Sequence, residues 1–142
     1  MATSSRFVVA AHLLTTLEFH EGEPVNSERL AQSINTNPAV VRRLLSQLSA
    51  ANLVRTQLGS GGGAMLGRSA KAISLLDVYR AVEDECVFSS HRNPPSEKCI
   101  VGKHILPVLE RTLEKAEEAL EAELAKVSIA EVASSIRRRA RA

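Results

Sequence analysis

Hydrophobic and polar residues alternate along most of this chain with the period of an α-helix. Apolar residues recur every three or four positions in six stretches, at residues 3–19, 27–34, 38–51, 74–82, 101–127 and 129–136. Two short apolar runs, residues 53–58 and 64–66, flank a glycine cluster and predict a β-hairpin. The pattern therefore predicts a mostly α-helical chain with one small hairpin.

Residues 25–56 predict a helix-turn-helix. Ser27 is expected to cap the first helix by accepting a hydrogen bond from an early backbone N–H, and Asn26 is the alternative cap. A short polar turn follows. Asn37 and Pro38 then predict the start of the second helix, because asparagine caps helices and proline loses no hydrogen bond in the first helical turn.

The second helix of this pair has the residue distribution of a helix that reads DNA. Its apolar stripe consists of Val41, Leu44, Leu45 and Leu48, and the residues largely off this stripe are Ala39, Val40, Arg42, Arg43 and Ser46. Adjacent arginines suit DNA because a guanidinium can bridge two acceptors on guanine or bind a phosphate. An ordinary helical hairpin with a solvated face has the same pattern and stays open as the alternative.

A hairpin directly after a helix-turn-helix is the arrangement of a winged helix. The glycines of the GSGGG segment at residues 59–63 allow backbone conformations closed to other residues, and they let the backbone lie close to a sugar–phosphate chain. A flexible linker would contain similar glycines but would not need a strand on each side. We therefore predict a winged helix-turn-helix with a β-hairpin wing.

The sequence resembles the BadM/Rrf-type winged-helix transcription regulators, a family that includes an iron–sulfur cluster regulator and a nitric-oxide-sensing repressor. The resemblance is carried by LAQSINTNPAVVRRLLSQLSAANLV, GSGGGAMLGRSAKAISLLDVYRAVE and CIVGKHILPVLERTLEKAEEALEAELAKVSIAEV, in that order and over nearly the whole chain. The glycine-rich wing followed by SLLDVYRAVE is the most specific part. The NPPSEKCIVG segment resembles the members without a cluster.

The resemblance implies a bacterial, sequence-specific transcription regulator, a repressor, that binds a palindromic operator as a homodimer. It places Arg42 at the base-reading position and brings the start of the first helix near the DNA backbone. The candidate DNA-contacting residues are Ser5, Arg6, Ser27, Asn37, Ala39, Val40, Arg42, Arg43, Gly61, Gly62 and Gly63. Two positions depart from the pattern: Leu58 stands where many relatives have a basic residue, and Ala64 where they have an aromatic one.

The long helix at residues 101–127 is predicted to be a dimerisation helix. Its approximate heptad positions hold Leu106, Leu109, Leu113, Ala116, Leu120 and Val127. A small winged helix cannot bury so long a stripe, so a second copy is expected to cover it. Pro107 must lie in the first turns of this helix or kink it. After a final capping box that begins at Ser128, a basic tail at residues 137–141 either contacts DNA phosphates or is simply solvated.

The length and charge of the chain bear on its DNA binding, its domains and its location. The 142 residues carry a net charge of only +2, so DNA binding depends on where the charges lie. We expect a DNA-binding domain at residues 1–80, and a sensor loop, dimerisation helix and short last helix at residues 81–142. No apolar run is long enough to span a membrane and no secretory signal pattern occurs, which favours a cytoplasmic protein.

Two cysteines, Cys86 and Cys99, are the candidate sensor thiols, and both lie in the least regular stretch of the chain. Metal-sensing relatives hold an iron–sulfur cluster with three cysteines here, so with the third missing we expect no cofactor and no metal, unless ligands are borrowed across a dimer. Cys99 precedes the long helix, where a helix N-terminus favours a thiolate that could sense oxidants. A buried, inert thiol is the alternative.

Catalysis is not predicted. No pair of carboxylates, nucleophile with a base, or phosphate loop occurs at usable spacing, and the glycine cluster lacks the lysine of a P-loop. The expected partners are double-stranded DNA, a second copy of the chain, and a small-molecule or redox effector. The competing interpretation is a winged helix that serves as a protein-interaction module without specific DNA binding.

Overall fold

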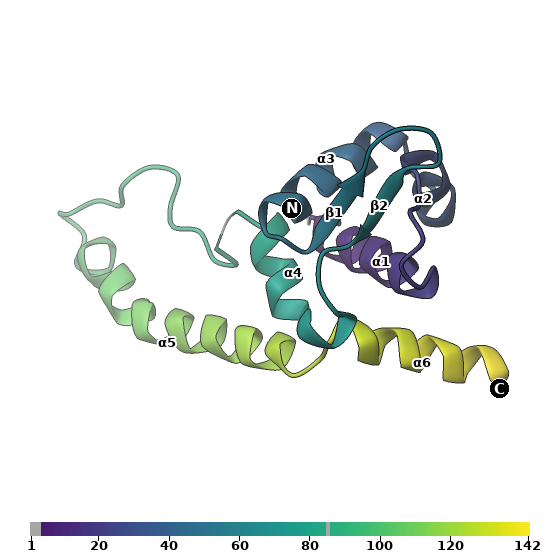
Figure 1. Cartoon of the computed structure of the whole chain (residues 1–142). Coiled ribbons are helices and arrows are strands. Elements are labelled where there is room, and N and C mark those ends of the chain that lie inside the picture. The colour runs from purple at the N-terminus through teal and green to yellow at the C-terminus, as the bar shows by residue number, and fades with distance from the viewer. Residues whose placement is uncertain (1–3, 85) are drawn as a thin grey trace. The chain divides into compact units, whose positions relative to one another are not determined.

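The computed structural model describes residues 4–84 and 86–142, which are mostly helical with one two-stranded sheet (Figure 1). The elements are α1 (Arg6–Phe19), α2 (Ser27–Ile34), α3 (Pro38–Ala50), β1 (Val54–Gln57), β2 (Gly63–Leu66), the 3₁₀-helix η1 (Ala70–Ala72), α4 (Leu75–Val82), α5 (Ile100–Ala125) and α6 (Ile129–Arg141). The chain forms two compact units. The first comprises the residues up to Asp84 together with Leu124–Ala142, and the second extends to Glu123.

Helix α2 is capped by Asn26, and the prediction that Ser27 caps it was wrong. The Asn26 side-chain oxygen accepts a hydrogen bond from the Arg29 N–H at 2.9 Å. A capping residue needs a non-helical backbone, which Asn26 has (φ −75°, ψ 163°), whereas Ser27 is already the first helical residue. The helix ends at Asn35, whose left-handed backbone (φ 61°) turns the chain toward α3.

Helix α3 begins as the sequence predicts. The Asn37 side chain accepts a hydrogen bond from the Ala39 N–H at 2.8 Å, and Pro38 is the first helical residue. At the other end, Asn52 adopts a left-handed conformation, and the Leu53 N–H bonds back to the Leu48 carbonyl at 2.9 Å. The helix-turn-helix is therefore defined at both ends by local hydrogen bonds.

The predicted hairpin is confirmed, although the first strand is shorter than predicted and the second begins one residue earlier, at Gly63. Strands β1 and β2 pair antiparallel, with Val54 opposite Leu66 and Gln57 opposite Gly63. The hairpin is also held to the segment before α2, because Val25 and Ala64 exchange two backbone hydrogen bonds of 3.0 and 2.8 Å. It is therefore a docked wing and not a flexible linker.

One core joins α1, α2, α3, α4, the wing and α6. Its largest fully buried side chains are Leu13, Leu14, Leu30, Leu48, Leu53, Ile73, Ile129, Val25, Val41, Val78 and Val82. Ile129 and Ala133 place α6 in this core, and the Ile129 N–H donates to the Ile73 carbonyl at 2.9 Å. The last helix thus packs with the N-terminal unit, whereas the sequence assigned it to residues 81–142.

Two capping motifs flank this junction, and the sequence predicts both, because SLLD at residues 74–77 and SIAE at residues 128–131 match the capping-box pattern. Ser74 and Asp77 form a complete capping box at the start of α4. Ser128 accepts a hydrogen bond from the Glu131 N–H at 3.1 Å at the start of α6. Both helices that meet at this junction are therefore fixed by their own first turns.

Helix α5 has no buried residue in the described structure. Pro107 lies inside it, so the hydrogen bond to the Lys103 carbonyl is missing there. Ile100 and Val108 are 79% and 70% exposed. The apolar residues of α5 thus lack a cover from their own chain.

Among the described helices, none combines the length and the apolar character that crossing a membrane requires.

Gly63→Ala tests the docking of the wing. We expect the free energy of unfolding to fall by about 1–3 kcal/mol, as at other overpacked sites, because a Cβ at residue 63 would lie 2.5 Å from the Val25 carbonyl carbon. Ser60→Ala, at the exposed wing tip, is the control, with a change within about 0.5 kcal/mol. Urea unfolding measures both, and equal stabilities of the two variants would contradict this close approach.

Candidate nucleic-acid interface

Helix α3 is anchored by one face and exposes the other. Val41, Leu44 and Leu48 are buried in the core of the first unit. The residues exposed on the opposite side include Ala39, Val40, Arg42 and Arg43. The buried stripe therefore fixes the helix and turns its arginines and small apolar residues outward, as a helix that enters the major groove requires.

Arg42 and Arg43 are free to bind a ligand. In the described parts of the chain, neither guanidinium forms an ion pair or a hydrogen bond with another side chain. Arginine presents five donors in a planar fork, so it can hold guanine or a phosphate through two bonds at once. Both side chains can therefore do this without breaking an internal contact.

The start of α1 is less open than the sequence indicates. Arg6 pairs with Glu83 at 3.3 Å, and its Nε donates to the Ser4 hydroxyl at 3.2 Å. Ser5 precedes the helix without a side-chain capping bond, so its hydroxyl is available. The Glu83 side chain is only 13% exposed, so moving Arg6 to a phosphate would leave a largely buried carboxylate without its cation. Ser27 is half-buried in the first turn of α2.

The wing glycines divide into two groups. Gly61 lies at the exposed tip with a positive φ of 75°, and nothing approaches the position that its Cβ would occupy. Gly62 and Gly63 face protein backbone: a Cβ would lie 2.9 Å from the Gly59 carbonyl oxygen or 2.5 Å from Val25. The fold itself therefore requires these two glycines, and Gly61 is the one best placed for an outside contact.

Arg55 on β1 is a candidate that the sequence reasoning missed. Val54 is buried while Arg55 is exposed, and no ion pair of Arg55 occurs in the described residues. Leu58, at the position where a basic residue is missing, is 89% exposed. Arg55 thus gives the wing a cation three residues before Leu58, the position where the basic residue is missing. The alternation of buried and exposed positions in a strand is the signal that could have found it.

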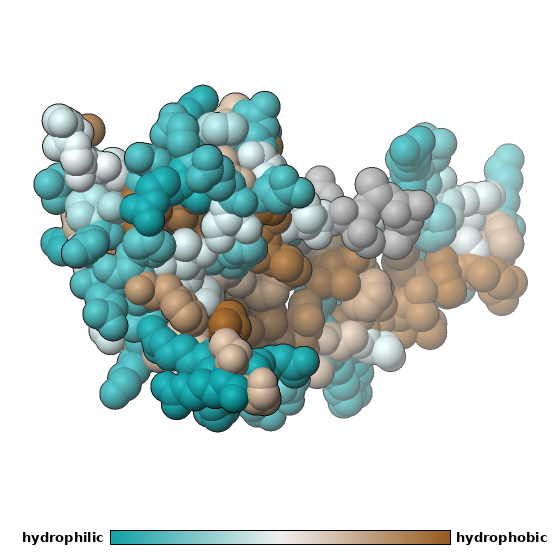
Figure 2. Space-filling model, turned by 90° about the vertical axis from the view of Figure 1, so that its right-hand side faces the viewer, coloured by the Kyte–Doolittle hydropathy of each residue, from teal (hydrophilic) through white to brown (hydrophobic). Residues whose placement is uncertain are grey.

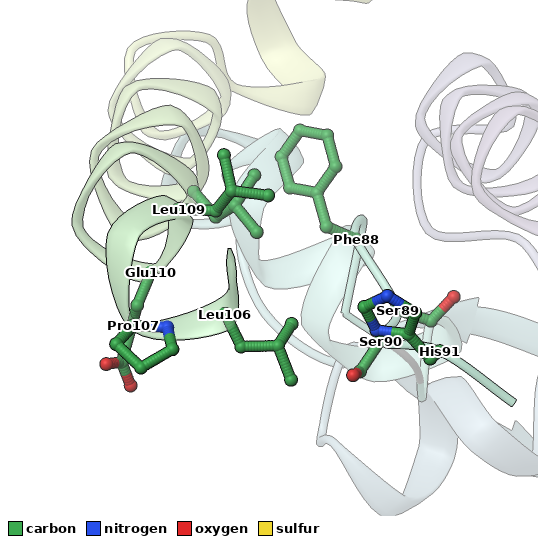
Figure 3. A pocket seen from close by; sticks show the side chains of 9 residues that line it. Phe88, Ser89, Ser90, His91, Leu106, Pro107, Leu109 and Glu110 are labelled. Carbon is green, nitrogen blue, oxygen red and sulfur yellow. The ribbon is translucent and has the colours of Figure 1, made fainter. Parts of the chain in front are cut away.

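A hydrophobic cavity of about 640 Å³ lies in the second unit (Figure 3). The Phe88 ring points toward Leu109, and Leu106 lies beside His91. The volume falls within the range of about 300–1,000 Å³ found for small-molecule pockets. This unit therefore has room for a small ligand, but its leucines also belong to the stripe of α5.

The donor atoms of this chain do not fit an iron–sulfur cluster. Cys86 and Cys99 are both exposed free thiols, which corrects the alternative of a buried Cys99. In the part of the chain that the structure describes, no three His, Cys, Asp or Glu side chains gather closely enough to hold a metal ion. Such clusters take four protein ligands, of which this chain supplies at most two thiolates. That the protein works without a cluster stays a prediction.

Comparison with known proteins confirms the resemblance seen in the sequence. Residues 3–135 match the Rrf2 family, described as iron-dependent transcriptional regulators. YwnA of Bacillus subtilis (strain 168), provisionally described as an HTH-type transcriptional regulator, is 43% identical over 130 residues, which is 91% of this chain and 95% of YwnA.

Solved structures agree with this match. A protein described provisionally as DNA-binding is 40% identical with a TM-score of 0.73, covering 90% of this chain and 98% of its own. CymR, the global cysteine regulator of B. subtilis, shares the fold at 22% identity, with a TM-score of 0.70 and coverages of 95% and 98%. The family and these relatives are regulators and not enzymes. The chain therefore belongs to the Rrf2 family of winged-helix transcriptional regulators.

Proposed function

We propose that this chain is a sequence-specific repressor that binds a palindromic operator as a homodimer, with α3 in the major groove. The observation that carries the proposal is the outward face of α3, where Arg42 and Arg43 have no internal partner among the described residues. A sequence reader needs such uncommitted donors, because base edges are recognised by direct hydrogen bonds.

Each exposed residue of α3 has a chemically suitable role in this proposal. Arg42 would bind guanine through two bonds, and Arg43 an adjacent phosphate. Ala39 and Val40 offer apolar surface for thymine methyl groups. The Asn37 oxygen is committed to the Ala39 N–H, which leaves its amide nitrogen to donate to DNA.

The exposed apolar surface of the chain supports a dimer. Val101 and Val108 on α5 are 63% and 70% exposed. Figure 2 shows hydrophobic side chains gathered among polar ones on the surface. In the first unit, Val8, Phe19 and Ile136 line a cavity of about 560 Å³ between α1 and α6. Contiguous apolar surface of this kind marks an interface. Two copies related by twofold symmetry would match a palindrome.

Arg42→Ala tests base reading. On the selected operator we expect a loss of about 1–3 kcal/mol in binding free energy, with a smaller loss on random duplex DNA, because a guanine contact is lost. Arg111→Ala removes the same charge from α5 and should change neither affinity. Fluorescence anisotropy measures all three proteins. Equal losses on both DNAs would make Arg42 a phosphate contact.

Salt titration separates the DNA reader from the interaction module. Phosphate contacts release counterions, so the logarithm of the binding constant of a DNA reader falls linearly with the logarithm of salt concentration. An interaction module shows no such binding in the same anisotropy assay. The free guanidiniums of α3 favour the DNA reader.

Leu109→Glu tests the dimer. Leu109 belongs to the heptad stripe of α5 and is 41% exposed. A charge there should convert the dimer to a monomer, because an unpaired carboxylate cannot be buried in an interface without a large cost. Leu109→Met keeps the apolar surface and serves as the control. Sedimentation velocity measures the masses, and a dimeric Leu109→Glu protein would exclude this part of α5 from the interface.

A redox signal is the second part of the proposal, and the position of Cys99 favours it. Cys99 has an exposed thiol and is the residue immediately before α5. Its carbonyl accepts a hydrogen bond from the Lys103 N–H at 2.9 Å, which fixes Cys99 at the start of the helix. A cytoplasmic location stays a prediction that follows from the family's role on DNA.

Cys99→Ser should abolish any loss of operator binding caused by mild hydrogen peroxide, because serine cannot be oxidised to a sulfenic acid. Cys86→Ser is the matched control and should keep the response. Anisotropy before and after oxidation measures it. An unchanged response in the Cys99 variant would remove this thiol as the sensor.

A further inference from the structure

A polar cleft of about 670 Å³ lies in the first unit where η1, the segment after α5, and α6 meet. Three cations line it, Lys71 from η1, Lys126 from the segment after α5, and Arg138 from α6. One carboxylate, Glu131, faces them. Serine hydroxyls complete much of the wall, and the first turn of α6 begins beside it.

Two of the three cations in this cleft, Lys71 and Arg138, have no carboxylate partner among the described residues. The Arg138 guanidinium donates to the Ser135 hydroxyl at 3.0 Å, which holds its position on the helix. Cations, hydroxyl donors and the positive end of a helix dipole all stabilise an anion. The cleft is therefore complementary to a compact, multiply charged anion.

We propose that this cleft binds a small phosphate-bearing molecule. The DNA backbone could supply the same chemistry, but the fold argues against it. Helix α6 packs on α1 and η1, whereas α3 packs mainly on α2, α4 and β1 and only weakly on α1. Figure 1 shows α3 and α6 on opposite sides of α1. DNA held by α3 would lie on the far side of the first unit from this cleft.

The cleft lies at a joint that links the wing to the dimerisation helix. The Leu75 N–H donates to the Val127 carbonyl at 2.8 Å, and the Ile129 N–H to that of Ile73 at 2.9 Å. Lys71 follows the wing and Lys126 follows α5, so one anion would tie both segments together. Helix α4, which starts here, packs on α3. The anion therefore regulates operator affinity, a consequence that rests on the proposed function, whereas its binding does not.

Pyrophosphate binding to the full chain without DNA tests the site. In isothermal titration calorimetry we expect saturable binding of one pyrophosphate per chain, measured against sodium chloride at equal ionic strength. Lys71→Gln with Arg138→Gln should weaken binding at least tenfold. Arg139→Gln removes a neighbouring charge outside the cleft and should not. Thermal unfolding verifies that both variants fold.

Three results would overturn the proposal. Pyrophosphate heats that do not exceed those of sodium chloride exclude a site. Equal weakening by Arg139→Gln means a diffuse charge effect along α6. If the double variant binds duplex DNA more weakly in the absence of pyrophosphate, the cleft serves the DNA backbone and not a free anion. Pyrophosphate that binds but leaves operator affinity unchanged supports the site and overturns its regulatory consequence.

Discussion

The two backbone hydrogen bonds between Val25 and Ala64 determine where the wing lies relative to the helix-turn-helix, the two elements that we propose to contact DNA. They join the wing to Val25, two residues before α2, so that the hairpin and the helix-turn-helix belong to one compact unit. Gly63 makes this approach possible, because any side chain there would meet the Val25 backbone. A wing attached only through its strands would not hold a fixed position beside α3.

Helix α3 is likewise held in place by a few contacts. Three buried side chains, Val41, Leu44 and Leu48, fix the helix in the core. The intervening Arg42 and Arg43 then project outward without internal partners among the described residues. Arg55 on β1 offsets the basic residue that is missing at Leu58, just after this strand. A near-neutral chain can therefore still present several cations on the elements that we propose to face DNA.

Local sequence signals predicted much of this fold. The caps at Asn37 and Ser74, the hairpin around the glycines and the length of α5 all depend on residues within a few positions of one another. The cap of α2 was wrongly predicted at Ser27, because Asn26 and Ser27 can both cap a helix. The backbone angles that decide between them cannot be deduced from the residue types.

The features that the sequence did not reveal depend on distant contacts. Arg6 and Glu83 pair although they lie 77 positions apart in the sequence, so this contact cannot be deduced from helical spacing. The burial of Ile129 requires knowing that the chain returns to its first unit after α5. The cleft around Lys71 and Arg138 depends on this same return, because its cations come from segments far apart in the sequence.

Selection of binding sites from random duplex DNA by the purified full chain tests the central claim most directly. Two α3 helices in a symmetric dimer should enrich an inverted repeat whose half-sites are about one helical turn apart, roughly 10–10.5 base pairs, or a multiple of it. Enrichment of a single half-site without symmetry would contradict the dimer. No enrichment at all, from protein that sediments as a folded species, would contradict the assignment of α3 as a reader of DNA sequence.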